Sequence, residues 1–120
     1  MSQIHSCQAI IVSCIDFRLQ KYIEKWTLEN ISGGYDKLSI AGAVKDIDYV
    51  LKQIEISVRL HHTKEVHLIN HEDCGAYGAE GSFEKHQNDL TKAKKAINDK
   101  FPQLQITLLY LKLDGEFVKI

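Results

Sequence analysis

Residues 8–18 read Q-A-I-I-V-S-C-I-D-F-R, and this stretch joins an apolar run to a group of reactive side chains. A short aliphatic run bounded by polar residues is typical of a strand buried in the middle of a sheet. The run ends at Cys14, and Asp16 and Arg18 follow it at alternate positions. The stretch therefore predicts a central strand over residues 8–14, with polar chemistry at its carboxyl end.

On both sides of this stretch, strand-like and helix-like segments alternate. Apolar residues at spacings of three and four predict helices over residues 18–29, 46–62 and 89–100, and aliphatic runs predict further strands over residues 37–41, 65–70 and 105–113. Asp114-Gly115 predicts a two-residue hairpin loop that returns residues 116–120 antiparallel to the last of these strands. We expect an α/β fold, with about four parallel strands and a C-terminal antiparallel strand flanked by helices, in a single domain over residues 1–120.

Composition narrows the functional classes. The formal net charge of −1 gives no long-range attraction to nucleic acid or to an acidic membrane. No apolar run is long enough to cross a bilayer, and the N-terminus lacks the basic start and apolar stretch of a secretion signal. Three cysteines are an odd set, which argues against a disulfide framework and for a reducing compartment. We therefore expect a cytoplasmic protein that binds neither nucleic acid nor membrane.

A second group of reactive residues, H-E-D-C-G at residues 71–75, follows the third expected strand. Ligands of parallel sheets bind at the carboxyl ends of the strands, so Cys14, His71 and Cys74 converge if the first and third strands are neighbours. Thiolate and imidazole are preferred zinc ligands, and three of them leave one position open for water or substrate. Each residue alone has an ordinary structural explanation, such as a small cysteine in the core. Together the three predict a Zn²⁺ site.

Asp16 and Arg18 allow two interpretations. They could be a surface carboxylate and the first residue of a helix. Alternatively, Arg18 fixes Asp16 through a guanidinium–carboxylate pair, and Asp16 accepts a hydrogen bond from zinc-bound water, whose pKa the metal lowers toward ~7.

With both motifs in order, the sequence resembles the β-class carbonic anhydrases, as a short and divergent member. That family carries C-x-D-x-R after its first core strand and H-x-x-C-G after its third. Residues 40–44, I-A-G-A-V, are similar to the family's A-G segment, and residues 109–117, L-Y-L-K-L-D-G-E-F, resemble its closing hairpin.

The resemblance implies zinc held by Cys14, His71 and Cys74, and an Asp16–Arg18 dyad. It implies a lyase, carbonate dehydratase, that reversibly hydrates carbon dioxide to bicarbonate through zinc-bound hydroxide. By position, Gly75 offers its backbone amide to the substrate and Val44 lines an apolar wall. Members of the family are dimers or assemblies of dimers, so we expect a homodimer or higher homo-oligomer.

Three alternatives stay open. The same scaffold could hydrolyse carbonyl sulfide or carbon disulfide. The chain could be a non-catalytic zinc-binding member, because Ser39-Ile40 replaces the family's usual Arg-Asn and seven residues precede the first expected strand, where the family has a helical arm. It could also be a thiol redox protein that uses Cys14 and Cys74 without metal. The residues do not decide whether Asp16 itself ligates zinc in a closed, inactive form.

The remaining histidines and cysteine have simpler interpretations. We expect His61 and His62 to end the long helix, where cationic side chains suit the helix dipole, and His67 to lie within a strand. We interpret Cys7 as structural, because no partner stands at a matching spacing. A second metal site is therefore not favoured by the sequence.

Overall fold

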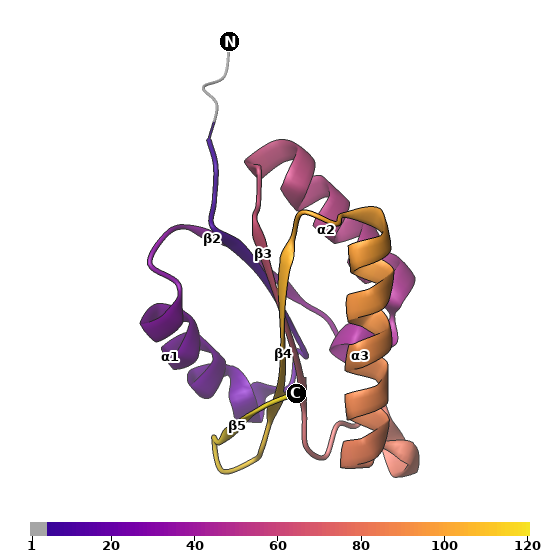
Figure 1. Ribbon diagram of the computed structural model, residues 1–120. Coiled ribbons are helices and arrows are strands. Elements are labelled where there is room, and N and C mark those ends of the chain that lie inside the picture. The colour runs from indigo at the N-terminus through magenta and orange to yellow at the C-terminus, as the bar shows by residue number, and fades with distance from the viewer. Residues whose placement is uncertain (1–4) are drawn as a thin grey trace.

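A computed structural model describes residues 5–120, and its strands and helices alternate along the chain in the expected order (Figure 1). The strands are β1 (Ala9–Ser13), β2 (Tyr35–Ser39), β3 (Glu65–His71), β4 (Gln105–Leu111) and β5 (Phe117–Lys119). The α-helices are α1 (Gln20–Asn30), α2 (Ile47–His61) and α3 (Phe83–Lys100). Short 3₁₀ turns lie at Phe17–Leu19 (η1), Ala43–Lys45 (η2) and Gly78–Glu80 (η3). Residues 1–4, which belong to the segment interpreted as lacking a secretion signal, lie outside the described residues. Within residues 5–120, no helix is both long and apolar enough to cross a membrane.

The sheet has the strand order β2-β1-β3-β4-β5. Strands β1 to β4 pair in parallel, and β5 pairs antiparallel with β4. The predicted α/β fold with four parallel strands and one antiparallel strand is thus confirmed. Because β1 is hydrogen-bonded to β3, with Ser13 opposite Ile69, the loops that follow these two strands leave the sheet side by side.

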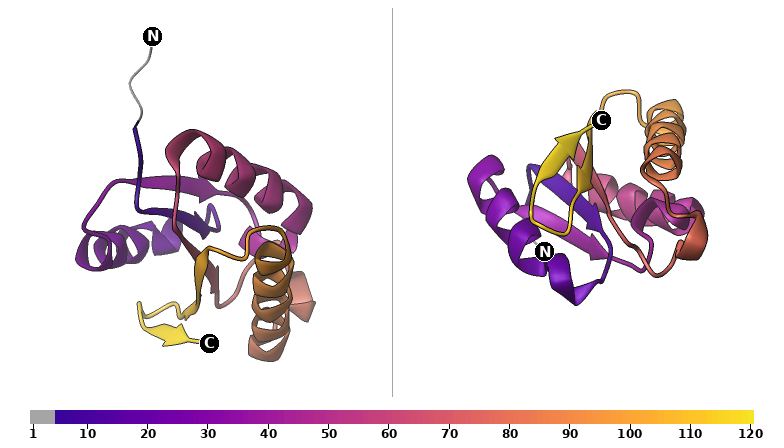
Figure 2. Two further views of the ribbon diagram at one scale, coloured as in Figure 1. Left: turned by 45° about the horizontal axis from the view of Figure 1, so that its top comes forward. Right: turned by 90° about the horizontal axis from the view of Figure 1, so that it is seen from below.

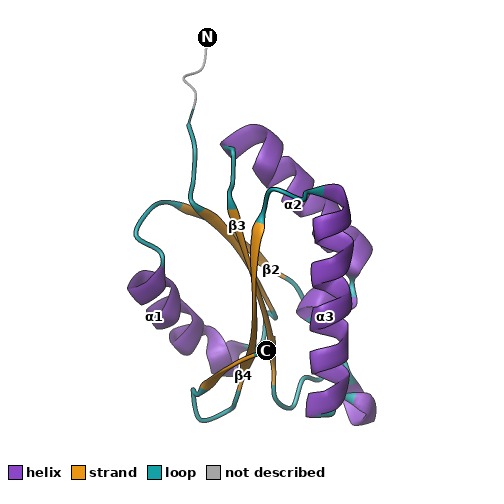
Figure 3. Cartoon of the chain, viewed as in Figure 1, coloured by secondary structure: helices purple, strands orange, loops and turns teal. Residues whose placement is uncertain are grey.

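Helices cover both faces of the sheet. Helix α1 lies on one face, and α2 and α3 lie together on the other (Figures 1 and 3). The views from other directions in Figure 2 show the same three layers. Each face has its own apolar core: Ile23 of α1 packs with Ile11 and Ile69, whereas Ile54 of α2 and Leu90 of α3 pack in the cluster on the opposite face. The two cores hold the strands from both sides and fix where their ends lie.

Helix α3 begins six residues earlier than the sequence pattern predicts. Ser82 caps it, because its hydroxyl oxygen accepts a hydrogen bond from the backbone N–H of Lys85 (3.1 Å). The buried stripe of the helix starts at His86, which is fully buried and continues the row of Leu90 and Ile97. The predicted start was wrong because a histidine occupies a core position that the apolar pattern does not mark.

The C-terminal hairpin turns through three residues instead of the predicted two. Lys112 donates its backbone N–H to the carbonyl of Glu116 (2.8 Å), and Gly115 donates to the carbonyl of Lys112 (2.9 Å). Gly115 has φ +96°, a left-handed conformation that suits glycine. Leu113-Asp114-Gly115 is therefore a tight turn that ends in a left-handed glycine, which is a common three-residue hairpin loop.

Candidate metal centre

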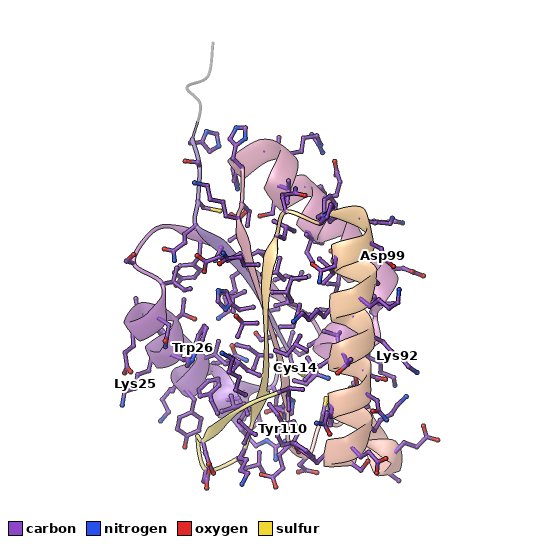
Figure 4. The ribbon with its side chains drawn as sticks, in the orientation of Figure 1. Cys14, Lys25, Trp26, Lys92, Asp99 and Tyr110 are labelled. Carbon is purple, nitrogen blue, oxygen red and sulfur yellow. The ribbon has the colours of Figure 1, made fainter. Side chains whose placement is uncertain are left out.

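Cys14, His71 and Cys74 converge at the carboxyl ends of β1 and β3. Cys14 follows β1 directly, His71 is the last residue of β3, and Cys74 lies in the loop after it. The Sγ atoms of the two cysteines are 3.9 Å apart, and one donor atom from each residue lies within 4.8 Å of the others. All three side chains are buried, and Figure 4 labels Cys14 in the interior, alongside the sheet. The pairing of β1 with β3 thus brings together residues 57 positions apart, as their numbers 14 and 71 show.

The geometry of the three donors fits a tetrahedral metal ion. Two thiolates bound to one zinc at about 2.3 Å lie roughly 3.8 Å apart, close to the 3.9 Å observed between the Sγ atoms of Cys14 and Cys74. The Nδ1 of His71 lies 2.7 Å from the carbonyl oxygen of Glu72, which can only accept, so Nδ1 carries the proton and Nε2 the lone pair. Nε2 is buried and has no hydrogen-bond partner among the described residues. A metal ion would satisfy this buried nitrogen, which is otherwise costly to leave unpaired.

Electrostatics favour one thiolate in this cluster. Burial raises the pKa of Cys14, but the neighbouring His71 imidazole and hydrogen bonds from the backbone amides of Gly42 and Asp16 outweigh burial and lower the pKa to about 7. The amide nitrogen of Gly42 lies 3.4 Å from the Cys14 sulfur. Burial raises the pKa of Cys74, and the neighbouring Cys14 raises it further. Burial lowers the pKa of His71, yet the neighbouring Cys14 sulfur and the hydrogen bond to the Glu72 carbonyl outweigh burial and raise it. Cys14 is therefore the sulfur that ionises first.

Asp16 and Arg18 form a close ion pair beside the three donors. Arg18 donates from its backbone N–H to Asp16 Oδ1 (2.9 Å), from Nε to both carboxylate oxygens (3.1 and 3.2 Å) and from a terminal nitrogen to Oδ2 (2.7 Å). These hydrogen bonds lower the pKa of Asp16 to about 2. Asp16 Oδ2 lies 3.9 Å from Nε2 of His71. An ionised carboxylate is thus held next to the convergence point of the donors.

Arg18 joins the loops after β1 and β3, and Gln20 supports the loop after β1; the sequence pattern did not reveal either role. Arg18 reaches across to Asp73, donating to its carboxylate (3.1 Å) and to its backbone carbonyl (2.9 Å). Gln20 donates its amide to the backbone carbonyls of Cys14 (3.0 Å) and Asp16 (2.8 Å). Three of these hydrogen bonds end on backbone carbonyls. The positions of carbonyls depend on loop conformation, so a pattern of residue types does not predict these bonds.

A shallow, open cavity of about 700 Å³ lies against this cluster. Asp16, Arg18, Asp73 and Gly75 line it together with small or apolar side chains, namely Cys14, Ile15, Phe17, Ala41 and Ala76. Phe17 and Ile15 are strongly exposed there, at 85% and 58%. Gly75, which the sequence resemblance assigns to substrate contact, is one of the residues that line this cavity. Val44, in contrast, is buried in the core on the face of α2 and α3 and is not among the residues that line this cavity.

A buried polar network lies behind the sulfurs and was not predicted. Tyr77 packs in one cluster with Cys14 and Cys74, and its hydroxyl donates to Asp89 (2.8 Å) and accepts from the side-chain amide of Asn70 (3.1 Å). The same amide group of Asn70 lies 2.9 Å from Nδ1 of His86. Burial lowers the pKa of His86 to about 4, so this imidazole is neutral near pH 7. The network therefore adds no positive charge behind the thiolates.

Comparison with known proteins identifies the family. The family model described as "Putative carbonic anhydrase" matches residues 4–120. An uncharacterized protein of Rickettsia bellii is 29% identical, over 100% of this chain and 85% of its own length. An uncharacterized protein of Rickettsia conorii is 30% identical, over 96% of this chain and 73% of its own length.

Solved structures show the same fold. The carbonic anhydrase of Streptococcus mutans superposes with a TM-score of 0.70 at 18% identity, covering 100% of this chain and 86% of that one. The carbonic anhydrase of Glaciozyma antarctica gives 0.69 at 19% identity, covering 98% and 84%. The β-carbonic anhydrase isoform I of Trichomonas vaginalis gives 0.68 at 15% identity, covering 100% and 87%. With the β-carbonic anhydrase fold and a family match over nearly its whole length, the chain belongs to this carbonic anhydrase family.

Proposed function

We propose that this chain is a zinc-dependent carbonic anhydrase that catalyses the reversible hydration of carbon dioxide to bicarbonate. One observation carries the proposal: two sulfurs and the unpartnered Nε2 of His71 converge beside an ionised carboxylate. Cys14, His71 and Cys74 would hold the zinc, and three protein ligands leave a fourth position open, as catalytic zinc sites require. Membership of the carbonic anhydrase family supports this assignment.

The bound metal supplies a Lewis acid that makes water a nucleophile near neutral pH. The chain itself orients the reactants. Asp16 stays ionised because Arg18 donates to both of its oxygens, so its carboxylate can accept a hydrogen bond from the attacking water. The same bonds engage the carboxylate with the guanidinium, which supports a role for Asp16 in orienting water instead of ligating the metal. We therefore propose the open form of the site.

The cavity beside the donors suits both substrate and product. Carbon dioxide is a small molecule without net charge, and Ile15, Phe17 and Ala41 present apolar surface to the cavity. Bicarbonate is an anion, and the guanidinium of Arg18 lines the same cavity. Gly75 lines it as well, with no atom within 4 Å of the place where a Cβ would stand, so a small ligand can approach its backbone. We propose that Gly75 contacts the substrate.

We also propose that the chain works as a homodimer. Phe17 and Ile15 expose most of their apolar side chains at the rim of the cavity, and a second copy packed on this rim would cover them and close the site. Light scattering coupled to gel filtration tests this directly. We expect twice the mass of the chain for the wild type and a smaller mass for Phe17→Asp. A wild type with the mass of one chain at micromolar concentration would contradict the dimer.

Stopped-flow measurement of carbon dioxide hydration tests the activity. We expect the zinc-loaded wild type to accelerate hydration well above buffer. Asp16→Ala should keep its zinc and lose about tenfold or more in kcat, because the residue that orients the water is gone. Asp99→Ala is the matched control, since Asp99 is an exposed carboxylate of α3 that pairs only with the exposed Lys95 (3.3 Å) among the contacts described.

The metal content of the same samples separates two kinds of failure. Cys74→Ser should lose both activity and the zinc of this site, because it removes a ligand. If the zinc-loaded wild type hydrates carbon dioxide no faster than Asp16→Ala, the protein is a non-catalytic zinc-binding member of its family and the proposed activity is wrong.

A further inference from the structure

A second group of metal-ligand types lies at the opposite end of the sheet. Cys7 precedes β1, Asp36 lies near the start of β2, and His61 is the last residue of α2. One donor atom from each lies within 4.8 Å of the others. Cys7 and Cys14 flank β1 at its two ends, and seven extended residues span roughly 20 Å. The group is therefore separate from the candidate metal centre and shares no residue with it.

Backbone hydrogen bonds hold the group together. The N–H of Cys7 donates to the carbonyl of His61 (2.9 Å), which joins the segment before β1 to the end of α2. The next residue, Gln8, donates to the carbonyl of Gly34 (2.8 Å), directly before β2. Helix α2 stops at this point because His62 takes a left-handed conformation (φ 55°). Three separate segments thus meet with fixed backbones.

We propose that Cys7, Asp36 and His61 bind a second zinc ion. Thiolate, imidazole and carboxylate are the three side-chain types that ligate zinc in proteins. The side chains of Asp36 and His61 are each 30% exposed, so an ion can enter from solvent. The fourth position is open to water or to His5, whose ring centroid lies 4.9 Å from that of His61. The interpretation of Cys7 as merely structural changes accordingly.

The hydrogen bonds of the group explain how it can exist with and without metal. In the structure, His61 Nδ1 lies 2.7 Å from Asp36 Oδ2, and Ser57 donates to the same oxygen (2.7 Å). The sulfur of Cys7 lies 3.1 Å from the hydroxyl of Thr63. Two ligands of a tetrahedral zinc with bonds near 2.0 Å stand about 3.3 Å apart, so His61 and Asp36 need to separate by only about 0.6 Å.

The two hydroxyls then act as outer partners of the ligands. With metal bound, Ser57 can keep donating to Asp36, and Thr63 can donate its hydroxyl proton to the Cys7 thiolate in place of the bond between the two hydroxyls (2.6 Å). Such outer hydrogen bonds orient metal ligands and raise affinity. The arrangement is therefore that of a ligand set with its supporting shell, and not only of a polar network that fills a gap.

Zinc stoichiometry tests this inference independently of the proposed activity. Metal-stripped protein is saturated with zinc, passed through gel filtration and analysed by elemental analysis and native mass spectrometry. We expect two zinc ions per chain for the wild type and one for His61→Asn. His62→Asn is the matched control, because it changes the adjacent histidine, which asparagine can replace in a left-handed conformation, and should keep two. A wild type with a single zinc, or equal zinc in the two variants, would overturn the second site.

Cobalt substitution provides a second test, because thiolate-to-cobalt absorption reports directly on the sulfur ligands of the bound metal. The two sites together offer three thiolates, two from the first site and one from Cys7. Cys7→Ser should therefore lower the thiolate-to-cobalt absorption by about one third, while serine can still hydrogen-bond to Thr63. In a Cys14→Ser, Cys74→Ser background, cobalt absorption from a thiolate should persist, and it should vanish when Cys7→Ser is added. Absence of this absorption in that background would refute the assignment.

Discussion

Replacing Arg18 with Gln is the sharpest perturbation of the candidate metal centre. Arg18 donates to both oxygens of Asp16 and also to Asp73, so one substitution removes the positive charge that pairs with both carboxylates. Glutamine keeps much of the length of the side chain and an amide donor but removes the positive charge. The change therefore isolates what the guanidinium does to the carboxylate.

The structure sets the size of the expected effect. Hydrogen bonds from Arg18 lower the pKa of Asp16 to about 2, against an ordinary value of about 3.9 for aspartate. Without the guanidinium, the pKa of Asp16 should rise from about 2 toward its ordinary value, although the backbone N–H of residue 18 still donates to the carboxylate. The sign follows from linkage: a depressed folded-state pKa contributes stability above the unfolded value, and this contribution is lost as pH falls from about 4 to about 2. Arg18→Gln should remove most of the contribution, so its stability should depend less on pH in that window.

Carbon-detected NMR of the side-chain carboxyls of the metal-free protein measures the titration of Asp16 directly. Asp73→Asn is the control, because Asp73 is 70% exposed and its loss leaves all of the bonds between Arg18 and Asp16 in place. We expect the pKa of Asp16 to be near 2 in the wild type and in Asp73→Asn, and to be clearly higher, closer to the ordinary value of about 3.9, in Arg18→Gln. In the zinc-loaded enzyme, the hydration rate of Arg18→Gln should fall by about 10- to 100-fold, the usual effect of losing an outer partner of a metal site. If Asp16 still titrated near 2 in Arg18→Gln, or if Asp73→Asn shifted it equally, the ion pair would not control this carboxylate.

Three further predictions concern the turn, the sulfurs and the metal. Gly115→Ala should destabilise the protein by about 1–3 kcal/mol in urea unfolding, because φ is +96° and a Cβ would lie 2.6 Å from a ring carbon of Tyr22; Gly34→Ala, whose Cβ would find its nearest atom at 3.8 Å, should change stability by under about 1 kcal/mol. In metal-free protein at pH 7.5, iodoacetamide should modify Cys14 more than about tenfold faster than Cys74, with a rate that falls as pH drops through about 7, and zinc should protect both, as peptide mass spectrometry can show. Chelation of zinc should lower the melting temperature by about 10 °C at a metal concentration 100-fold above Kd, and an unchanged melting curve would speak against specific binding.

Much of the fold and part of the candidate metal centre could be predicted from the amino-acid sequence. The aliphatic run before Cys14 and the one before His71 each predict a buried strand, and both strands are found in the middle of the parallel sheet. Parallel neighbours place their carboxyl ends at one edge, so the convergence of the three donors follows from topology alone. The residues expected to act together beside them, Asp16 and Arg18, are indeed in contact. Their roles in binding and catalysis stay predictions.

Other features depend on backbone geometry that residue types do not encode. Gln20 acts through the carbonyls of Cys14 and Asp16, and Arg18 acts partly through the carbonyl of Asp73, whose φ is +57°. Side-chain hydrogen bonds to main-chain atoms do not require a particular residue at the accepting position, so a sequence pattern does not predict them.

The proximity of Cys7, Asp36 and His61 could not be predicted from the sequence either. Cys7, Asp36 and His61 come from three separate segments, and each is ordinary in its own sequence context. Only the hydrogen bond between Cys7 and the backbone of His61 and the position of β2 beside β1 bring them together.

The hydrogen bonds from Arg18 to Asp73 allow the protein to fold without depending on a bound metal ion. Many small zinc-binding domains are unfolded without the ion, so part of the free energy of metal binding is used to fold the chain. Here two hydrophobic layers and the contacts of Arg18 and Gln20 assemble the donors in advance. If the chain is the zinc enzyme proposed above, a cell short of zinc would therefore hold it folded but inactive until the metal returns.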